Sequence, residues 1–514
     1  MKNRRFTLPL VPAIPLFSLT FITILLFSAH PASAASGTWL AAPADNNWFN
    51  PANWSSGTVP VAGDDATFES STIHNIVIPQ GDSIADIIFD ADADVFTITA
   101  QPGVGLGITD TVLNLSSAEQ NFVAESEGNS SGSFTFEIGN IVGPVMFTQQ
   151  ATSEAAGAPG YVRFEIAQAG PATFHSLGAT SSGGVGGQTY FIYTGTSADA
   201  CTVTNDGASA SGASGGGTLF LQGKPSAGNA TLIANGGTNG GGGGYFLFDD
   251  GSLGGTARLE VFGNGYMDMT GRTGPSLSIG SIEGDGQIYL SKGTLMVGTN
   301  NLSTTFSGVL HPGSSTGGSG TGALTKIGSG TLTLSGANLY TAGTTVSAGT
   351  LVVSNTTGSA TGTGAVQVSA GTLGGGGVVS GAVTIGTGGG TGAFLAPAHG
   401  TQKQATLTIQ SGLTLQADAT YTYTFKAKRN KARTDKGVAN GVTINGATFV
   451  FQGTAQGALK QGLVLTVISN TSASPITGTF ANLPDGAIVT VNGNNFQASY
   501  EGGDGNDLTL TVVP

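Results

Sequence analysis

A short glycine-punctuated strand returns at nearly regular intervals in the middle of the sequence. The pattern GTLTL at residues 330–334 is followed by GTLVV at 349–353 and by GTL at 371–373, so the returns fall 19 and 22 residues apart. A strand that returns every ~20 residues is typical of a β-solenoid, in which each turn of the chain stacks on the one before. The sequence therefore predicts an all-β chain that builds a long shape rather than a pocket.

The same segment carries a family resemblance. Residues 324–326 (LTK), 328–334 (GSGTLTL), 336–344 (GANLYTAGT) and 349–351 (GTL) closely resemble the autotransporter-associated β-strand repeat. The preceding GTNNLSTTFSGVL is similar to the segment that commonly comes before this repeat. The resemblance covers about 290–375, near one sixth of the chain. It implies a secreted, right-handed parallel β-helix, often the passenger of a larger surface protein, and it implies no reaction.

The composition agrees with a solenoid. Glycine accounts for 85 of 514 residues, roughly twice its ordinary usage, without the Gly-x-y period of collagen. Charged residues make up 9% of the chain, against about 25% in typical soluble domains. Apolar-rich strands lie between the glycine-rich turns, which favours an ordered chain over a disordered one.

The N-terminus has the pattern of a secretory signal peptide over residues 1–34. Basic residues lie at its start, residues 16–27 form an apolar core, and 32–34 (ASA) form a small-residue cleavage site. We expect cleavage after Ala34. The alternative is an uncleaved anchor, for which the apolar run is short. No second apolar segment in the sequence is long enough to span a bilayer, so we expect a secreted or cell-surface protein of a Gram-negative bacterium.

Changes in composition divide the rest of the chain into four segments. These are a tryptophan-rich N-terminal module or cap (35–70), irregular β-helix coils (71–285), the regular repeat region (286–417) and a C-terminal antiparallel β cap (418–514). Gly/Ser clusters at 181–187, 207–217 and 235–244 suit corners or loops in which φ is positive. At ~22 residues a coil and about 4.8 Å a strand, the mature chain would form roughly 20 coils and a rod on the order of 100 Å long.

All three tryptophans, Trp39, Trp48 and Trp54, lie in the N-terminal module. This segment resembles a module often found ahead of these repeats. The end of a solenoid exposes an apolar cross-section and unpaired strand edges, and three large aromatic rings would cover them. The alternative is a platform of exposed indole rings that stacks on sugars.

Charge is distributed unevenly along the chain. The mature chain has 14 Lys and Arg against 30 Asp and Glu, so its net charge is near −16, which weighs against nucleic acid and anionic membranes as partners. Twenty-four of the 30 acids lie before Gly286, and none lies between Gly286 and Ala417.

A basic run lies between two predicted strands of the C-terminal cap. It contains Lys426, Lys428, Arg429, Lys431, Arg433 and Lys436. One interpretation is a solvated hairpin loop that keeps a strand edge from pairing with other chains. The other is a contact with an acidic polymer, with lipopolysaccharide, or with the acidic N-terminal half of a neighbouring molecule.

Residues 502–510 (GGDGNDLTL) fit the Ca²⁺-binding nonapeptide of β-roll toxins. The carboxylates of Asp504 and Asp507 are hard oxygen ligands. Such sites take ligands from successive turns, and only one copy occurs in this sequence. A turn into the last strand is therefore favoured over a calcium site, and both interpretations stay open.

Many polysaccharide lyases and hydrolases are parallel β-helices, so the fold alone does not exclude an enzyme. A glycosidase needs two carboxylates about 5–9.5 Å apart. Asp249 and Asp250 resemble the acids of polygalacturonase-like patterns, in which a His-Gly follows about one coil later. The His-Gly of this sequence, at 399–400, begins 149 residues further on, roughly seven coils away. The lyase route needs an arginine base. Arg163, Arg258 and Arg272 stand near no acid cluster in the sequence.

The remaining candidates receive structural interpretations. Alternating acids at Asp86, Asp90, Asp92 and Asp94 favour a solvated face over a metal site. The histidines occur singly, at His74, His175, His311 and His399, and we assign them no catalytic role. Cys201 has no histidine within about 25 residues, so a buried structural thiol is favoured over a nucleophile.

These observations together predict an exported, non-enzymatic, right-handed parallel β-helix that is structural or passenger-like. We assign no catalytic, cofactor-binding or metal-binding residue. The alternatives are a glycan-binding adhesin and a β-helix polysaccharide lyase or hydrolase. The expected partners are a cell-surface polysaccharide or an outer-membrane export or anchoring protein. We expect neither nucleic acid as a partner nor a transmembrane segment in the mature chain.

Overall fold

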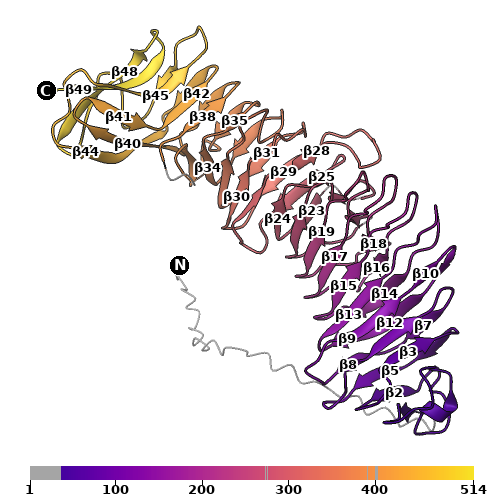
Figure 1. The fold of residues 1–514 in the computed structure, drawn as a ribbon. Coiled ribbons are helices and arrows are strands. Elements are labelled where there is room, and N and C mark those ends of the chain that lie inside the picture. The colour runs from indigo at the N-terminus through magenta and orange to yellow at the C-terminus, as the bar shows by residue number, and fades with distance from the viewer. Residues whose placement is uncertain (1–35, 250, 273, 275, 391, 400–402) are drawn as a thin grey trace, which may run out of the picture.

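The computed structural model describes residues 36–249, 251–272, 274, 276–390, 392–399 and 403–514. Over these residues the chain winds into a long, curved parallel β-helix (Figure 1). Among the described residues there is one short 3-10 turn, η1 (Pro51–Asn53), and no α-helix. The described residues thus contain no helix that is long and apolar enough to cross a bilayer. The predicted signal peptide lies outside the described residues. The expected all-β solenoid is confirmed.

One sheet runs along most of the rod, and we call it the long sheet. Each strand pairs in parallel with the strands one coil earlier and one coil later, as Phe147 does with Phe122 and Phe174. Its strands are β3 (Asn75–Ile78), β6 (Thr97–Ala100), β9 (Gln120–Ala124), β13 (Val145–Gln149), β15 (Thr173–Ser176), β17 (Thr202–Asn205), β19 (Thr231–Ala234), β21 (Arg258–Val261), β24 (Ser281–Gly284), β27 (Thr304–Phe306), β30 (Thr331–Leu334), β32 (Thr350–Val353), β34 (Gly371–Gly375), β37 (Ala393–Ala396), β40 (Ala419–Lys428) and β44 (Thr448–Gln456).

A second parallel sheet forms another face of the rod, and we call it the tyrosine sheet after five tyrosines that it carries. Its strands are β1 (Gly37–Thr38), β2 (Asp65–Phe68), β5 (Asp86–Phe89), β8 (Val112–Asn114), β12 (Ser133–Val142), β14 (Tyr161–Gln168), β16 (Gln188–Ile192), β18 (Gly217–Leu221), β20 (Tyr245–Phe248), β22 (Tyr266–Asp268), β25 (Gln287–Tyr289) and β28 (Val309–His311), with β4 (Asp82–Ile84) and β7 (Gly105–Ile108) joined to β12.

Two further sheets complete the rod. The third sheet is parallel and contains β23 (Ser276–Ile279), β26 (Thr294–Val297), β29 (Ala323–Lys326), β31 (Thr344–Val346), β33 (Val366–Val368), β36 (Val383–Ile385), β39 (Leu413–Leu415), β43 (Val442–Asn445) and β46 (Thr477–Thr479). The fourth begins with parallel β35 (Val378–Val379), β38 (Thr406–Ile409), β42 (Lys436–Ala439) and β45 (Val464–Asn470).

The fourth sheet ends in antiparallel strands. From β45 it continues through β49 (Asp507–Val513), β48 (Asn494–Gly502) and β47 (Ile488–Val491), each antiparallel to the one before. An antiparallel cap is therefore present at the C-terminal end, but it is smaller than the predicted segment 418–514, because β42, β43 and β44 still stack in parallel with the coils before them. Two hairpins stand apart from the coils: β10 (Ser126–Glu127) with β11 (Ser130–Ser131), and the end of β40 with β41 (Lys431–Thr434).

Alternating burial explains why these segments form strands, because successive side chains point to opposite faces. In β14, Val162 and Phe164 are buried, whereas Tyr161 and Arg163 are partly exposed. The inward phenylalanines stack from coil to coil. Five of them form one ladder with successive ring centroids 4.6, 5.1, 5.1 and 4.6 Å apart: Phe136, Phe164, Phe191, Phe220 and Phe248. Each ring contact adds about 0.5–1.5 kcal/mol to the burial of the ring, so the ladder stabilises the register of the coils.

The tryptophan module closes the N-terminal end of this core. Trp39, Trp48 and Trp54 are at most 2% exposed. The Trp54 ring centroid lies 5.2 Å from that of Trp39 and 5.0 Å from that of Trp48, and all three rings pack on Phe68 of β2. The predicted cap is confirmed. The alternative of a sugar-stacking platform is wrong, because the faces of the three rings are buried against one another and against the core and are not exposed to a ligand.

Coil length differs from the expected ~22 residues. Tyr161 pairs with Gln188, Gln188 with Gly217 and Gly217 with Tyr245, so these coils take 27 to 29 residues; the next, from Tyr245 to Tyr266, takes 21. The described residues stack 16 strands in the long sheet, fewer than the roughly 20 coils expected. At about 4.8 Å a strand, the stack is about 70 Å long rather than 100 Å.

The extra residues of the longer coils form glycine-rich loops between the long sheet and the tyrosine sheet. One glycine in each loop, Gly183, Gly212 and Gly240, has a φ of 76°, 73° or 79°, as predicted. Close stacking requires other glycines: a Cβ on Gly215 would lie 2.4 Å from the carbonyl oxygen of Gly243 on the next coil. The loops therefore stack as tightly as the strands.

Candidate functional site

The outer surface of the tyrosine sheet carries two rows of side chains in register. One row contains Tyr161, Gln188, Gly217, Tyr245, Tyr266 and Gln287, and the other contains Arg163, Tyr190, Leu219, Leu247, Asp268, Tyr289 and His311. Both rows point away from the core, because they alternate with the buried phenylalanine ladder. Stacking of the coils thus gathers five tyrosines from a long stretch of sequence on one face.

Tyr245 leans over the preceding coil. A Cβ on Gly217 would lie 2.2 Å from Cζ of the Tyr245 ring, so the ring fills the space that a larger residue would need there. The ring also stacks on Tyr266 of the next coil, with centroids 5.4 Å apart and an interplanar angle of 14°. Gln188 Nε2 donates a hydrogen bond of 3.3 Å to the Tyr245 hydroxyl. Gly217 and Gln188 therefore fix the position of Tyr245.

A hollow of about 430 Å³ opens beside these rings, and we call it the tyrosine groove. Its lining combines aromatic and aliphatic side chains with acids and hydroxyls: Ser214, Leu221, Tyr245, Leu247, Phe248, Asp249, Tyr266, Asp268, Thr270, Gly271, Ser315 and Thr316. Small-molecule sites typically measure about 300–1,000 Å³ and have an apolar lining with a few polar groups. The tyrosine groove has both properties.

Asp268 holds one wall of the groove in place. Its Oδ2 accepts hydrogen bonds from the backbone nitrogen and hydroxyl of Ser315 at 2.8 and 2.6 Å. Its Oδ1 accepts a hydrogen bond of 2.7 Å from the backbone nitrogen of Thr270, and another from the Thr270 hydroxyl. Four donors thus satisfy a carboxylate that is only 5% exposed. Asp268 therefore anchors the loop that follows β28 against the tyrosine sheet.

Asp249 is the second acid of the groove and follows β20. Gly271 lies against its carboxylate, since a Cβ on Gly271 would lie 2.1 Å from Oδ1. The Arg272 guanidinium donates hydrogen bonds to the Ser252 hydroxyl at 3.0 Å and to the Ser276 carbonyl at 2.8 Å. Burial lowers the pKa of Arg272, and the charge of Asp249 opposes this shift. The groove therefore has an acid with a fixed cation nearby.

The hydroxyls of Tyr245, Tyr266 and Tyr289 remain protonated at neutral pH. Burial raises the pKa of Tyr266 to about 12 and also raises the pKa of Tyr245 and Tyr289. Burial lowers the pKa of His311, which stacks on Tyr289 with ring centroids 4.7 Å apart. This face therefore offers neutral groups that both donate and accept hydrogen bonds.

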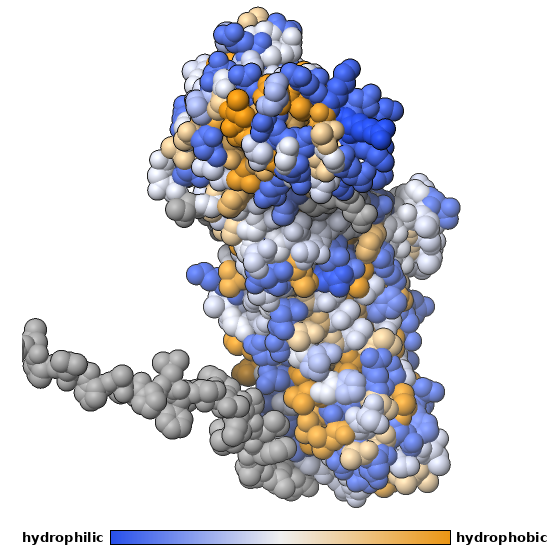
Figure 2. Space-filling view, turned by 90° about the vertical axis from the view of Figure 1, so that its left-hand side faces the viewer, coloured by the Kyte–Doolittle hydropathy of each residue, from blue (hydrophilic) through white to orange (hydrophobic). Residues whose placement is uncertain are grey.

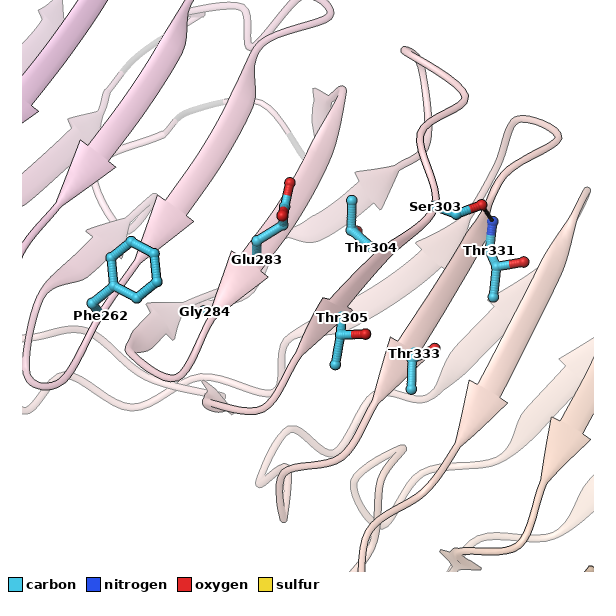
Figure 3. A pocket seen from close by; sticks show the side chains of 8 residues that line it. All are labelled: Phe262, Glu283, Gly284, Ser303, Thr304, Thr305, Thr331 and Thr333. Carbon is cyan, nitrogen blue, oxygen red and sulfur yellow. Dashed lines mark hydrogen bonds between the residues drawn. The ribbon is translucent and has the colours of Figure 1, made fainter. Parts of the chain in front are cut away.

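A second hollow, also of about 430 Å³, lies on the long sheet where β24, β27 and β30 meet (Figure 3). Its lining is rich in hydroxyls: Phe262, Glu283, Gly284, Ser303, Thr304, Thr305, Thr331 and Thr333. β24 and β27 share a single paired position, Gly284 with Phe306, so the two strands part there. Arg258 donates to the Glu283 carboxylate at 2.6 and 3.0 Å. Because its acid is paired and it has one aromatic ring, this hollow is the weaker candidate.

The structure places Asp249 and His399 on different coils of the rod. Asp249 follows β20, and the next strand of the long sheet after it is β21. His399 Nε2 lies 3.5 Å from the hydroxyl of Thr350 on β32, four strands further along that sheet. Asp250 and Gly400 lie outside the described residues. The arginines have acidic neighbours that the sequence did not reveal: Arg163 pairs with Glu165 at 2.8 Å, and Arg258 pairs with Glu260 and Glu283 at 3.2 and 2.6 Å.

The alternating acids do not gather into one site, and the histidines lie apart from one another. Asp86 Oδ1 accepts a hydrogen bond of 2.7 Å from the backbone of Thr111, and Asp94 accepts one of 2.9 Å from the backbone of Ser71. The other histidines have separate partners, His74 with Asp94, His175 with Asp206 and His311 with Gln287. Nowhere in the described chain do three or more His, Cys, Asp or Glu side chains gather closely enough to hold a metal ion.

Cys201 lies in the core, and the nonapeptide at residues 502–510 forms a turn. Cys201 is fully buried, and burial raises the pKa of its thiol, as expected for a structural residue. The nonapeptide forms the turn from β48 into β49, with Gly503 and Gly505 at φ values of 62° and 109°. Asp507 Oδ1 accepts a hydrogen bond of 2.9 Å from the backbone of Asn470. This geometry agrees with the favoured interpretation as a turn.

Sequence reasoning missed the tyrosine groove. Its lining comes from residues between Ser214 and Thr316, and the relevant strands are separated by coils of unequal length. The available signal was the recurrence of tyrosine at or near the start of successive strands, as in YFLF at 245–248 and YMD at 266–268. Each tyrosine precedes an inward residue, which places it outside.

The fold defines the class of protein, a capped parallel β-helix, and one segment of it matches a known repeat. Residues 324–353 match the family model described as the passenger-associated-transport-repeat, which confirms the resemblance for that segment. Among solved structures, the Hap adhesin of Haemophilus influenzae matches with 11% identity and a TM-score of 0.28, over 88% of this chain and 64% of that chain. The chain thus spans less than two thirds of that structure. No curated protein matches.

Proposed function

We propose that this chain is an exported, passenger-like β-helix that acts by binding and catalyses no reaction. The match of residues 324–353 to a passenger-associated repeat supports its export and its place at the cell surface or in the extracellular space. The signal-peptide pattern of residues 1–34 supports the same route. Stacked coils suit a rod that displays a face over its length, since each coil needs only its neighbours for stability.

The ligand that we propose for the tyrosine groove is a carbohydrate. Tyr245, Tyr266 and Leu247 supply apolar surface for the C–H faces of sugar rings. The tyrosine hydroxyls, Asp249 and Thr316 supply donors and acceptors for sugar hydroxyls. This groove, an aromatic and carboxylate-lined hollow on the outside of the rod, is the observation that carries the binding function.

Two features of the groove favour binding over catalysis. The two oxygens of Asp268 accept hydrogen bonds from four donors of Thr270 and Ser315, so this carboxylate holds the wall of the groove in place. Among the described residues, the lining has one other carboxylate, Asp249, whereas a glycosidase acts through a pair. The proposed partner is a cell-surface polysaccharide, and we propose an outer-membrane export or anchoring protein for its attachment.

A glycan array and a polysaccharide-degradation assay on residues 35–514 test this function together. We expect specific binding without release of product. Tyr266→Ala removes the stacked ring from the groove and should weaken binding about tenfold, which corresponds to about 1.4 kcal/mol. Tyr161→Ala is the matched control, because it removes a tyrosine of the same row that does not line the groove.

Three results would contradict the proposal. Release of product would show an enzyme. Equal weakening by Tyr266→Ala and Tyr161→Ala, with both variants folded, would place the binding elsewhere. Silence of the wild-type chain on the whole array would leave a purely structural role for the exported rod.

A further inference from the structure

The hairpin at the C-terminal end concentrates positive charge in an otherwise acidic chain. The last part of β40 pairs antiparallel with β41, so that Lys426 lies opposite Arg433 and Lys428 lies opposite Lys431. All four side chains are exposed. We call these four residues the basic hairpin. Like charges directly opposite each other on neighbouring strands are destabilising, so this arrangement has a cost in stability.

In the part of the chain that the structure describes, no acid pairs with these cations to offset this cost. Among the described residues, none of the four cations takes part in an ion pair. The nearest acid in sequence, Asp435, is fully buried, and its carboxylate accepts hydrogen bonds from the backbone of Thr424 at 2.9 Å and of Ala405 at 3.2 Å. Its charge is therefore directed into the fold. The cations remain available to an external anion.

The basic hairpin also lines a hollow. This hollow has a volume of about 680 Å³, and its lining includes the four cations together with Thr454 and Gln456 of β44. In Figure 2, strongly hydrophilic residues lie along the right-hand side of the upper end, which carries the C-terminal strands, next to a hydrophobic patch. A surface of Thr, Gln, Lys and Arg offers donors to anionic groups and to hydroxyls alike.

We propose that the basic hairpin binds an anionic polysaccharide, a glycan with a carboxylate, sulfate or phosphate on successive sugars. Successive outward residues of a strand, such as Lys426 and Lys428, lie about 6.6–6.8 Å apart, so the hairpin presents a row of cations to a row of anions. The chain has a net charge of −13, and no acid is among the described residues that line the hairpin hollow. An anionic polymer is therefore repelled by the acidic N-terminal coils and attracted to the basic hairpin.

Simple protection of a strand edge does not account for the geometry. Charged residues, especially lysine, commonly keep an edge strand from pairing with another chain. One or two lysines on β41 would be enough for that purpose, whereas two full pairs of like charges face each other across the hairpin. Protection of the edge also does not require the hollow or the uncharged Thr454 and Gln456 beside it.

The test measures the affinity of the full mature chain for polygalacturonate, heparin, neutral dextran and double-stranded DNA. The hairpin variant is Lys426→Gln/Lys428→Gln. Its matched control is Lys224→Gln/Lys292→Gln, which removes the same charge from exposed sites elsewhere on the rod. We expect binding to polygalacturonate or heparin, none to dextran, and weakening at higher salt. The hairpin variant should raise the dissociation constant about tenfold and the control less than about twofold.

The two anionic polymers separate carboxylate from sulfate chemistry, and thermal unfolding separates binding from folding. Removal of like-charge repulsion should leave the unfolding midpoint of the hairpin variant unchanged or higher. If that midpoint falls, Lys426→Arg/Lys428→Arg keeps the charge, and binding should be retained. The proposal is overturned if the wild-type chain binds neither polymer, if the control weakens binding equally, or if DNA binds as tightly as the polysaccharides. Salt-sensitive self-association of the chain without polysaccharide binding would instead assign the hairpin to contact between copies.

Discussion

His175 and Asp206 lie on successive coils of the long sheet, and Nε2 of the histidine is 2.6 Å from Oδ2 of the aspartate. Asn235 on the following coil donates a hydrogen bond of 3.0 Å to Oδ1 of the same aspartate. Three coils are thus tied together at one corner. The hydrogen bond that His175 donates to Asp206 raises the pKa of His175, and the same bond lowers the pKa of Asp206.

These shifts predict a window of pH in which the pair stabilises the fold. The raised pKa of His175 gives a contribution that is complete below about pH 6.5 and is lost as the pH rises through the folded-state pKa. The lowered pKa of Asp206 gives a contribution that is complete above about pH 3.9 and is lost as the pH falls through its folded-state pKa. Water screens the pair, whose side chains are 38% and 34% exposed, so we expect less than about 1 kcal/mol.

Thermal unfolding of the wild-type chain and of His175→Gln checks this window. The difference in midpoint between the two proteins should be larger at about pH 5.5 than at about pH 8.5. A difference that does not change with pH would show that the pair contributes through shape and not through charge.

A methyl group on Gly217 should disturb the tyrosine groove without removing any residue that lines it. Gly217→Ala places a Cβ where the Tyr245 ring now lies, so the ring must move away from its stack with Tyr266. We expect weaker glycan binding and a loss of about 1–3 kcal/mol in stability. Gly412→Ala is the control, because the nearest atom to its Cβ is 3.8 Å away. Unchanged binding in Gly217→Ala would mean that Tyr245 does not position the ligand.

The phenylalanine ladder should tolerate no gap. Phe191 is fully buried between Phe164 and Phe220, with ring centroids 5.1 Å away on both sides. Phe191→Ala should cost about 3–5 kcal/mol of unfolding free energy. Phe394 on β37 is 37% exposed, so Phe394→Ala should lower the unfolding free energy far less. Urea unfolding followed by circular dichroism measures both, and equal costs would contradict a core built on the ladder.

Within the repeat, Leu332→Ala should cost about 2–5 kcal/mol, since Leu332 is 1% exposed. The same urea experiment measures it. A cost below about 1 kcal/mol would show that the inner surface of the repeat relaxes around the missing side chain.

Lys326 should stabilise the repeat through its hydrogen bonds. The residue is 1% exposed, and its Nζ donates to the carbonyls of Ile327 and Gly328 at 2.5 and 3.0 Å and approaches that of Ala348 at 3.5 Å. Lys326→Met leaves these carbonyls without that donor and should cost about 1–3 kcal/mol. Denaturant midpoints of the two proteins at neutral pH measure the cost, and a stabilised variant would contradict it.

The same lysine predicts a pH dependence with a definite sign. Burial lowers the pKa of Lys326 to about 8. The unfolded chain, with a lysine pKa of about 10.4, then binds more protons between these values, so stability rises with pH in that range. The advantage of the wild-type chain over Lys326→Met should therefore be larger at about pH 9.5 than at about pH 7.5. An equal advantage at both pH values would show that the ammonium stays charged when buried.

The sequence predicted the architecture because its signals are local. The recurring GTL pattern places Leu332, Leu351 and Leu373 one coil apart, and these three residues pair in register in the long sheet. The role of the tryptophans as a cap was also predictable, because the apolar end of a solenoid must be shielded from water and three large rings close together can shield it.

The groove and the length of the rod were not predictable, because both depend on the register between coils. A period of ~22 residues fits the repeat, but the coils between Tyr161 and Tyr245 take 27 to 29 residues. An error of about six residues per coil moves every outward side chain to a different partner. The loop of Ser315 adds a second difficulty, since it reaches Asp268 across 47 residues.

The stacked strands of the long sheet also set a fixed distance between the two surfaces. The tyrosine groove lies beside β22, and the basic hairpin lies on β40, with six steps of the long sheet from β24 to β40 between them. At about 4.8 Å a step, the two surfaces are about 30 Å apart along the rod. Insertion or deletion of a whole repeat would change that spacing by one step and leave each surface intact. Two polymers held at these positions would therefore be kept at a separation that the number of intervening repeats determines.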